Sequence, residues 1–372
     1  MTATVSAQGR DDTVGQVSAH GRAAADRRVI LRTRRSRRLV LAVSCVLVLV
    51  LSWAGVVNGV TDISSARLLA TLLPGGDRLA TPLDWNEWVA VVQLRLPRIA
   101  MAVVAGVGLA LAGATMQIIT ANPMASPFTT GISNAAAFGA SIAIMAGLSL
   151  GGSRTLGTIA FAFIGAVLCS LLVFAIAAVT RMGPTAIILA GIALSYLFSA
   201  LAAGLQYVAD EQQLSSIIHW TFGDLGRATW PQIGIAAGVV FAASLHARFN
   251  STNYQRFAAG DDVARSLGVQ VTRLRLETGL AITLVAATVI SVTGVIGFVG
   301  LVAPHIASML VGADERYRLP LTATVGASVI LAADLLGRLV LSPIIVPVGI
   351  VVSLVGVPVF LWLILREGRW SR

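Results

Sequence analysis

The chain has 372 residues, of which 56% are hydrophobic and 12% are charged, whereas a soluble domain carries about 25% charged residues. This composition excludes an ordinary soluble protein and indicates an all-α polytopic membrane protein with about ten transmembrane helices of about 20 residues. The net charge of +10 does not indicate nucleic-acid binding, because arginines crowded at one end are typical of a cytoplasmic N-terminus. The partner that this composition predicts is the lipid bilayer, and no nucleic acid is expected.

The N-terminal part, residues 1–36, is polar and rich in arginine and alanine. Such a segment cannot bury enough apolar surface to fold, so it is predicted to be a disordered basic cytoplasmic tail. Residues 37–372 are predicted to form the transmembrane domain, beginning with an outward span from Val40 to about Val57. Cys45 and Cys169 both fall inside apolar runs, which argues against a structural disulfide.

The next apolar run extends from Ile99 to Ile119 and follows the sequence RLPR at Arg95–Arg98. Gly106, Ala110 and Gly113 place small residues along this run. Small side chains let two helix backbones approach closely, so this span is predicted to pack tightly against its neighbours.

The run ends at ANPMASP, Ala121–Pro127, where two prolines and Asn122 break the helix. Irregular backbone cannot face lipid, so this segment must face water or protein. It is either a plain turn between helices or part of a gate.

The remaining spans are expected at about 131–149, 156–179, 185–208, 232–248, from 277, 294–307, 321–336 and 346–365. With ten crossings, both termini lie in the cytoplasm, and so do the polar segments 254–275 and 312–320. The polar segment 210–231 lies outside and is predicted to be re-entrant or interfacial.

The segment Tyr254–Arg275 is the most highly charged part of the interior of the sequence. Gly260 and Asp261 open a short helix within it, and Asp261 and Asp262 place negative charge at its N-terminus, where the helix dipole favours it. Gly268 closes the helix.

One edge of this short helix is apolar, because Val263 and Leu267 are four residues apart. Asp261 and Arg265 have the same spacing and can pair. An apolar edge held in water predicts a docking surface, although a solvated connector is an equally good reading of this pattern alone.

Ionisable residues inside the predicted spans are few. Asp334 and Arg338 can pair on one helix face, and no chain of carboxylates suggests a proton relay. His219, His246 and His305 do not stand at metal-ligand spacing, and no nucleotide-binding or hydrolase motif is present. We therefore expect no cofactor, no metal and no catalytic site.

Taken together, these segments resemble the FecCD-type permeases, the membrane subunits of ABC importers for ferric siderophores, haem and cobalamin. The resemblance covers about Arg95 to Arg369. It rests on seven motifs in order: RLPR (95–98), NPMASP (122–127), GISNAAAFGA (131–140), AAGDDVARSLGV (258–269), GVIGFVGLVAPHI (294–306), ADLLGR (333–338) and PVGIVVSLVGVPVFLWLI (347–364).

The resemblance implies the type II ABC importer permease fold, within residues 37–372, with a cytoplasmic coupling loop at about 250–275. It implies four kinds of partner: two cytoplasmic ABC ATPase subunits, a second permease in a homodimer or a paralogous heterodimer, an extracytoplasmic substrate-binding protein and the membrane. ATP hydrolysis would then take place on the separate ATPase subunits, and this chain would be a transporter subunit without enzymatic activity.

The resemblance also assigns roles to residues. The coupling helix would comprise Gly260, Asp261, Asp262, Ala264, Arg265, Leu267 and Gly268. Outer arginines that meet the binding protein would be Arg95, Arg98 and Arg338, and the cytoplasmic gate would comprise Asn122, Met124, Pro184 and Thr185.

Three positions depart from the family pattern: Ser126 stands where an acidic residue is common, Ser308 where arginine is common, and Ile345 where glutamate is common. The predicted cargo is a ferric siderophore, with cobalamin or haem as the alternative. An ion-coupled secondary transporter and an intramembrane enzyme are the distant alternatives.

Overall fold

The computed structural model describes residues 34–59, 63–72, 80–180 and 183–367, and the regular secondary structure in these ranges is helical. The first helix is Arg34–Val57, so it includes the last three residues of the predicted tail, whose residues 1–33 lie outside the described ranges. The elements after it are α2 (Ser65–Leu72), α3 (Trp85–Ala90), η2 (Val91–Arg95), α4 (Leu96–Ile119), η3 (Pro127–Thr130), α5 (Ile132–Met145), α6 (Arg154–Val179), α7 (Pro184–Val208), α8 (Glu211–Thr221), η4 (Leu225–Arg227), α9 (Trp230–Phe249), α10 (Ser251–Phe257), α11 (Asp261–Ser266), α12 (Val271–Thr293), α13 (Val299–Val311), α14 (Glu315–Leu339) and α15 (Val348–Glu367).

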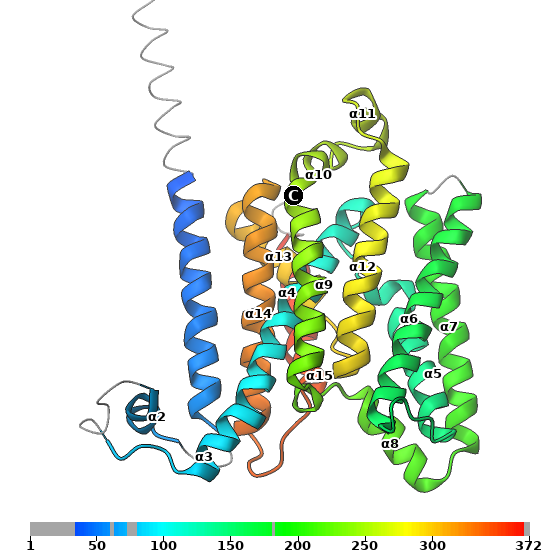
Figure 1. Ribbon diagram of the computed structural model, residues 1–372. Helices are drawn as coiled ribbons and strands as arrows, with labels where there is room; N and C mark the ends of the chain where they lie inside the picture. The colour runs from blue at the N-terminus through cyan, green and yellow to red at the C-terminus, as the bar shows by residue number, and fades with distance from the viewer. Residues whose placement is uncertain (1–33, 60–62, 73–79, 181–182, 368–372) are drawn as a thin grey trace, which may run out of the picture.

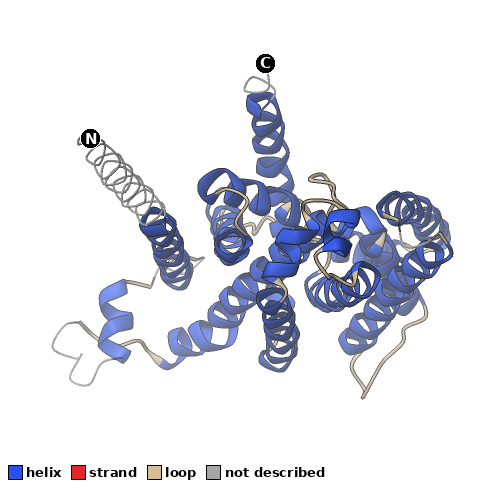
Figure 2. Cartoon of the chain, turned by 90° about the horizontal axis from the view of Figure 1, so that it is seen from above, coloured by secondary structure: helices blue, strands red, loops and turns tan. Residues whose placement is uncertain are grey.

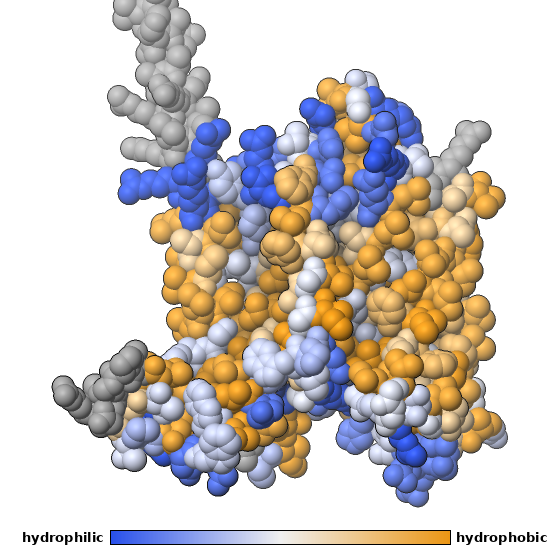
Figure 3. Space-filling view, viewed as in Figure 1, coloured by the Kyte–Doolittle hydropathy of each residue, from blue (hydrophilic) through white to orange (hydrophobic). Residues whose placement is uncertain are grey.

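Seven helices in the described ranges are long and apolar enough to cross a membrane, and three shorter apolar helices, Ile132–Met145, Val299–Val311 and Val348–Trp362, accompany them. The expected number of about ten is confirmed. The bundle has an apolar belt between two hydrophilic ends (Figure 3). One end carries α10 and α11 and the other carries α2, α3 and α8 (Figure 1), and we call them the α11 end and the α8 end.

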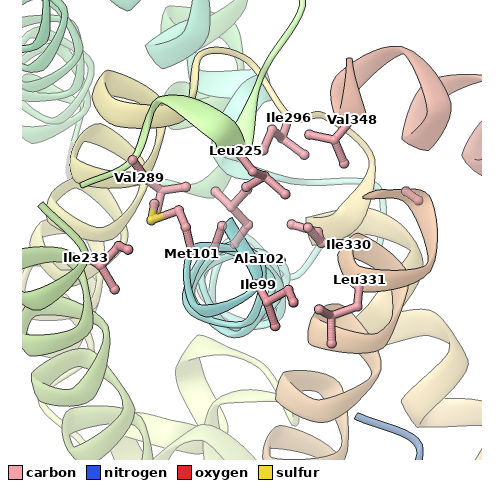
Figure 4. Close-up of a cluster of buried hydrophobic side chains, with 14 of the residues drawn as sticks. Ile99, Met101, Ala102, Leu225, Ile233, Val289, Ile296, Ile330, Leu331 and Val348 are labelled. Atoms are coloured by element: carbon pink, nitrogen blue, oxygen red, sulfur yellow. The ribbon is translucent and has the colours of Figure 1, made fainter. Parts of the chain in front are cut away.

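Helix α4 is the centre of the bundle and packs against α9, α12, α13 and α14. Its side chains Met101 and Ala102 are fully buried and meet Val289 and Ile330 from neighbouring helices (Figure 4). Because lipid provides no hydrophobic drive between helices, close packing must hold such a centre together.

Two glycines on α4 make this packing possible. A Cβ atom at Gly106 would lie 2.5 Å from Cα of Ala327 on α14, and one at Gly113 would lie 2.0 Å from the carbonyl oxygen of Gly300 on α13. Both distances are shorter than any tolerable contact with backbone, so the predicted role of these small residues is confirmed.

The RLPR sequence lies inside a continuous helix, Trp85–Ile119, rather than ahead of one. Pro97 has no amide hydrogen to donate to the preceding turn. The helix accommodates it by widening into the π-helical turn η2 immediately before α4, as is usual for such local insertions. The two arginines therefore belong to the α8 end of the central helix.

The first helix lies at the edge of the bundle (Figures 1 and 2). Only 11% of its most apolar 18-residue stretch is buried. Polar contacts fasten it at two levels. Near the α11 end, Arg37 pairs with Asp314 at 3.1 Å, and Ser44 donates a hydrogen bond to Thr324 at 2.6 Å. At the α8 end its last carbonyl groups are bonded by arginines.

Candidate functional site

Helix α11 lies at the predicted position, in the loop that joins α10 to α12. Gly260 precedes it with a φ of 102° and Gly268 follows it with a φ of 82°, both values that favour glycine. The amide of Gly268 donates to the carbonyl of Arg265 at 3.0 Å, and that of Val269 donates to Ala264 at 2.9 Å. These bonds satisfy the last carbonyl groups of the helix.

Helix α11 projects beyond the end of the bundle (Figure 1), and two of its apolar side chains are exposed. Val263 is 45% exposed and Leu267 is 53% exposed. Asp261 and Arg265 pair at 3.8 Å, and Arg265 also pairs with Asp262 at 3.0 Å. The result is an exposed apolar pair beside a charged cluster.

The inner edge of α11 is anchored in an apolar cluster. Ala264 is fully buried there with Tyr254 and Phe257 of α10. Desolvation by burial raises the pKa of Tyr254 to about 12, so its hydroxyl stays protonated at physiological pH and pairs with that of Thr278 at 3.0 Å. Gln255 donates to Asp314 at 2.8 Å, which ties α10 to the start of α14.

The predicted gate segment is an irregular turn between α4 and η3. Ala121 has a φ of 46°, which costs a residue with a Cβ about 1–2 kcal/mol. The side chain of Asn122 accepts a hydrogen bond from the amide of Met124 at 2.9 Å, and Met124 is 49% exposed. The turn is therefore held locally while one apolar side chain protrudes from it.

This turn faces α7 across a cavity of about 400 Å³ lined by Asn122, Met124, Ile192 and Tyr196 among others. A Cβ at Gly191 would lie 2.6 Å from the carbonyl oxygen of Thr129, so α7 packs directly on η3. The other two expected gate residues, Pro184 and Thr185, lie in the first turn of α7 and do not line this cavity.

At the α8 end, the three arginines expected to meet a partner are engaged within the chain. The Arg95 guanidinium donates to the carbonyl oxygens of Val56 and Val57 at 2.7 and 2.9 Å. Arg338 donates to Gly55 and Asn58, both at 2.9 Å.

Arg98 donates to Asp334 at 2.6 Å and lies 3.6 Å from Asp224. Asp334 also lies 3.1 Å from Arg338, so the pair expected from their spacing is confirmed. Arg95 is 7% exposed and Arg338 is 5% exposed. A docking role for these arginines stays a prediction, and in the single chain Arg95 and Arg338 are buried against its own backbone.

The sequence did not indicate two of the charged residues in these networks. Asp224, in the segment after α8, reaches Arg98, and Arg275 of α12 reaches Asp261. Each pair joins residues with no helical spacing between them, so no local pattern could have identified them.

The three departures from the family pattern are distributed over both ends. Ser126 is buried and precedes η3 as its N-cap. Ser308 donates to the carbonyl of Pro304 at 2.9 Å and accepts from Arg318 of α14 at 3.5 Å. Ile345 is 41% exposed in the turn before α15.

A hollow of about 770 Å³ opens at the α8 end, where α5, α6 and α8 meet. Its wall carries Arg154, Asp210, His219 and Arg227. Desolvation by burial lowers the pKa of Arg227, and the nearby Asp224 opposes this shift. The hollow thus combines charged side chains with apolar ones, among them Ile144 and Trp220.

Comparison with known proteins places these features in context. A model of the FecCD transport family matches residues 45–366. The hemin transport system permease of Yersinia pestis is 37% identical over 76% of this chain and 84% of its own length.

An Fe(3+)-citrate import system permease of Bacillus subtilis is 33% identical over 91% of this chain and 98% of its own length. A vitamin B12 import system permease of Vibrio cholerae is 33% identical over 76% of this chain and 84% of its own length. These relatives are named as permease proteins of transport or import systems, in agreement with the expectation of a transporter subunit.

A solved structure has the same fold with a TM-score of 0.78 and 29% sequence identity, over 88% of this chain and 99% of the other. It shows, in an inward-facing conformation, an ABC transporter provisionally assigned to the metal-chelate type. The expected permease fold is thereby confirmed.

Proposed function

The chain belongs to the FecCD transport family and is a multi-pass ABC importer permease, and we propose that its cargo is a ferric siderophore carried across the cytoplasmic membrane. Relatives named for ferric citrate and hemin support an iron-containing cargo. Haem and cobalamin are the alternatives, since relatives are named for hemin and for vitamin B12.

In this proposal, ATP hydrolysis by two cytoplasmic ABC ATPase subunits drives transport, and these subunits bind α11. The α11 end then lies in the cytoplasm, with both termini, and an extracytoplasmic binding protein delivers the cargo at the α8 end. A second permease, identical or paralogous, completes the transport path along α7. Much of α7 is exposed and apolar, as Leu189, Tyr196 and Leu201 illustrate, which supports lipid and protein neighbours there.

The proposed contact between α11 and the ATPase subunits rests on one observation. Val263 and Leu267 form an exposed apolar pair on a helix whose other face is buried against α10. ATP binding closes the ATPases and moves α11, and the gate turn at Asn122 and Met124 opens or closes in response. Ion coupling is disfavoured, because the buried carboxylates of the described ranges, Glu315 and Asp334, both pair with arginine.

Replacing Leu267 with glutamate tests the proposal. A charge in a desolvated contact costs several kcal/mol, so uptake is expected to fall at least about tenfold and ATPase subunits to copurify poorly. The control is Ala313→Glu, which adds the same charge in the turn before α14 at the same end.

Uptake is measured in proteoliposomes supplied with each chelate on its binding protein. Uptake of the ferric siderophore alone supports the assigned cargo, and uptake of haem or cobalamin instead replaces it. Unchanged uptake by the Leu267→Glu variant would show that α11 is not the ATPase contact.

A further inference from the structure

Arg275 is the largest fully buried side chain in the described part of the protein. It lies one turn into α12, and its side chain is 1% exposed. Burying a guanidinium group costs free energy unless hydrogen bonds and opposite charge in the protein replace its contacts with water. The contacts of Arg275 therefore indicate what the residue holds in place.

Two of these contacts join separate parts of the molecule. The Nε atom donates to the carbonyl oxygen of Ile119 at 2.9 Å. The Nη1 and Nη2 atoms donate to the two carboxylate oxygens of Asp261 at 3.2 and 3.0 Å. The guanidinium also lies over the ring of Phe257, 4.9 Å from its centroid.

The two residues joined in this way have distinct places in the fold. Asp261 is the first residue of α11, and Ile119 is the last residue of α4. Two residues after Ile119 comes Ala121, with its positive φ, and then the gate turn with Asn122 and Met124. A single side chain thus connects the exposed helix to the base of the turn.

The bond geometry suits the transmission of movement. Apolar contacts such as those of Ala264 are non-directional and allow sliding, whereas a bidentate arginine–carboxylate pair fixes both distance and orientation. The Ile119 carbonyl is among the last four of α4, which lack partners within a helix. Arg275 supplies its partner and so holds the end of α4.

We propose that Arg275 is a positioning residue that transmits displacement of α11 to the gate turn, through Asp261 on one side and the Ile119 carbonyl on the other. This rests on the proposed function, in which ATPase subunits move α11. When α11 moves, the Asp261–Arg275 pair pulls on the end of α4, and the turn that carries Met124 changes its exposure.

Two variants interrupt this link. Asp261→Asn removes the carboxylate, and Arg275→Lys keeps the positive charge but loses the fork that reaches two partners at once. Their matched controls are Glu277→Gln and Arg273→Lys, which alter an exposed pair joined at 2.7 Å on the same helix. The controls make the same kinds of side-chain change within two residues of Arg275.

The readout is the accessibility of the gate turn. A Met124→Cys change is made in a Cys45→Ala background, where the remaining Cys169 is buried. The reaction with a water-soluble maleimide is measured in the assembled transporter, with and without a non-hydrolysable ATP analogue. Uptake per ATP hydrolysed is measured alongside on chains that retain Met124.

The expected result is a nucleotide-dependent maleimide rate in the parent and both controls. In Asp261→Asn and Arg275→Lys this dependence is lost, and uptake per ATP falls about tenfold, within the usual range of coupling between sites. ATPase subunits still copurify with the Arg275→Lys variant, because it leaves every residue of α11 intact.

The inference is overturned if either variant keeps a maleimide rate that depends on nucleotide. A variant that keeps this dependence and loses only thermal stability also overturns it. Failure of the proposed function has a different signature, since the parent itself would then bind no ATPase subunit and show no nucleotide dependence. Should Asp261→Asn fail to assemble, Arg275→Lys decides the outcome, because it retains the buried charge pair.

Discussion

At the scale of single residues, Asp334 is the carboxylate on which the charge balance at the α8 end depends. It is 1% exposed and lies between Arg98 at 2.6 Å and Arg338 at 3.1 Å. The side chain of Arg98 is 11% exposed and that of Arg338 is 5% exposed. Asp224 lies 3.6 Å from Arg98. Two guanidinium groups with little access to water thus share the single negative charge of Asp334.

Replacing Asp334 with asparagine is expected to destabilise the protein by about 3 kcal/mol or more, because it leaves buried positive charge without its partner. Thermal unfolding in detergent measures the effect. Glu277→Gln is the control, since its pair with Arg273 is exposed and its loss is expected to cost less than about 1 kcal/mol. Equal melting temperatures for the two variants would contradict this account.

The sequence predicted part of this network and missed the rest for a physical reason. Asp334 and Arg338 are four residues apart on one helix, so their pairing follows from helical geometry. Arg98 and Asp334 are 236 residues apart, and only the packing of α4 on α14 brings them together. The same packing buries the arginines that the sequence placed on an outer surface.

At the scale of elements, the first helix depends on its end contacts. Its sides are largely exposed, and its last carbonyl groups would otherwise lack partners. Arg95 bonds Val56 and Val57, and Arg338 bonds Gly55 and Asn58. Positive charge at a helix C-terminus is also favoured by the helix dipole.

Replacing Arg95 with methionine is expected to raise hydrogen exchange at the end of the first helix, at Leu51–Asn58, roughly tenfold, as the loss of charged hydrogen bonds implies. Exchange in α12 should not change. Arg67→Met is the control, because its partner Glu87 lies in α3 and not in the first helix. Unaltered exchange at Leu51–Asn58 would mean that the arginine does not hold the helix.

The spans themselves follow from the sequence, because apolar length is a strong local signal. The loop helix α11 also follows from it, since glycines and charged residues mark its ends. The continuous helix through Arg95–Arg98 could not be predicted in the same way. Its π-helical turn depends on how α4 packs, and a proline usually marks a helix boundary.

At the scale of the whole molecule, the two hydrophilic ends differ in a way that suits a transporter. The α11 end presents a projecting helix with exposed apolar side chains, and the α8 end presents a hollow of about 770 Å³ with charged side chains in its wall. Arg275 and the buried arginines of the α8 end hold α4 at opposite ends.

The orientation of these ends in the membrane decides whether this arrangement works as proposed. The orientation is tested with single cysteines introduced in a Cys45→Ala background. One replaces Asp262, whose side chain is 98% exposed, and the other replaces the exposed Gln212 on α8. Arginine-rich segments favour the cytoplasmic side, so a membrane-impermeant maleimide should label Gln212→Cys in intact cells and Asp262→Cys only after permeabilisation. The Cys45→Ala parent, whose Cys169 is buried, gives the background. The reverse pattern would put α11 outside the cell, where no ATPase subunit could reach it.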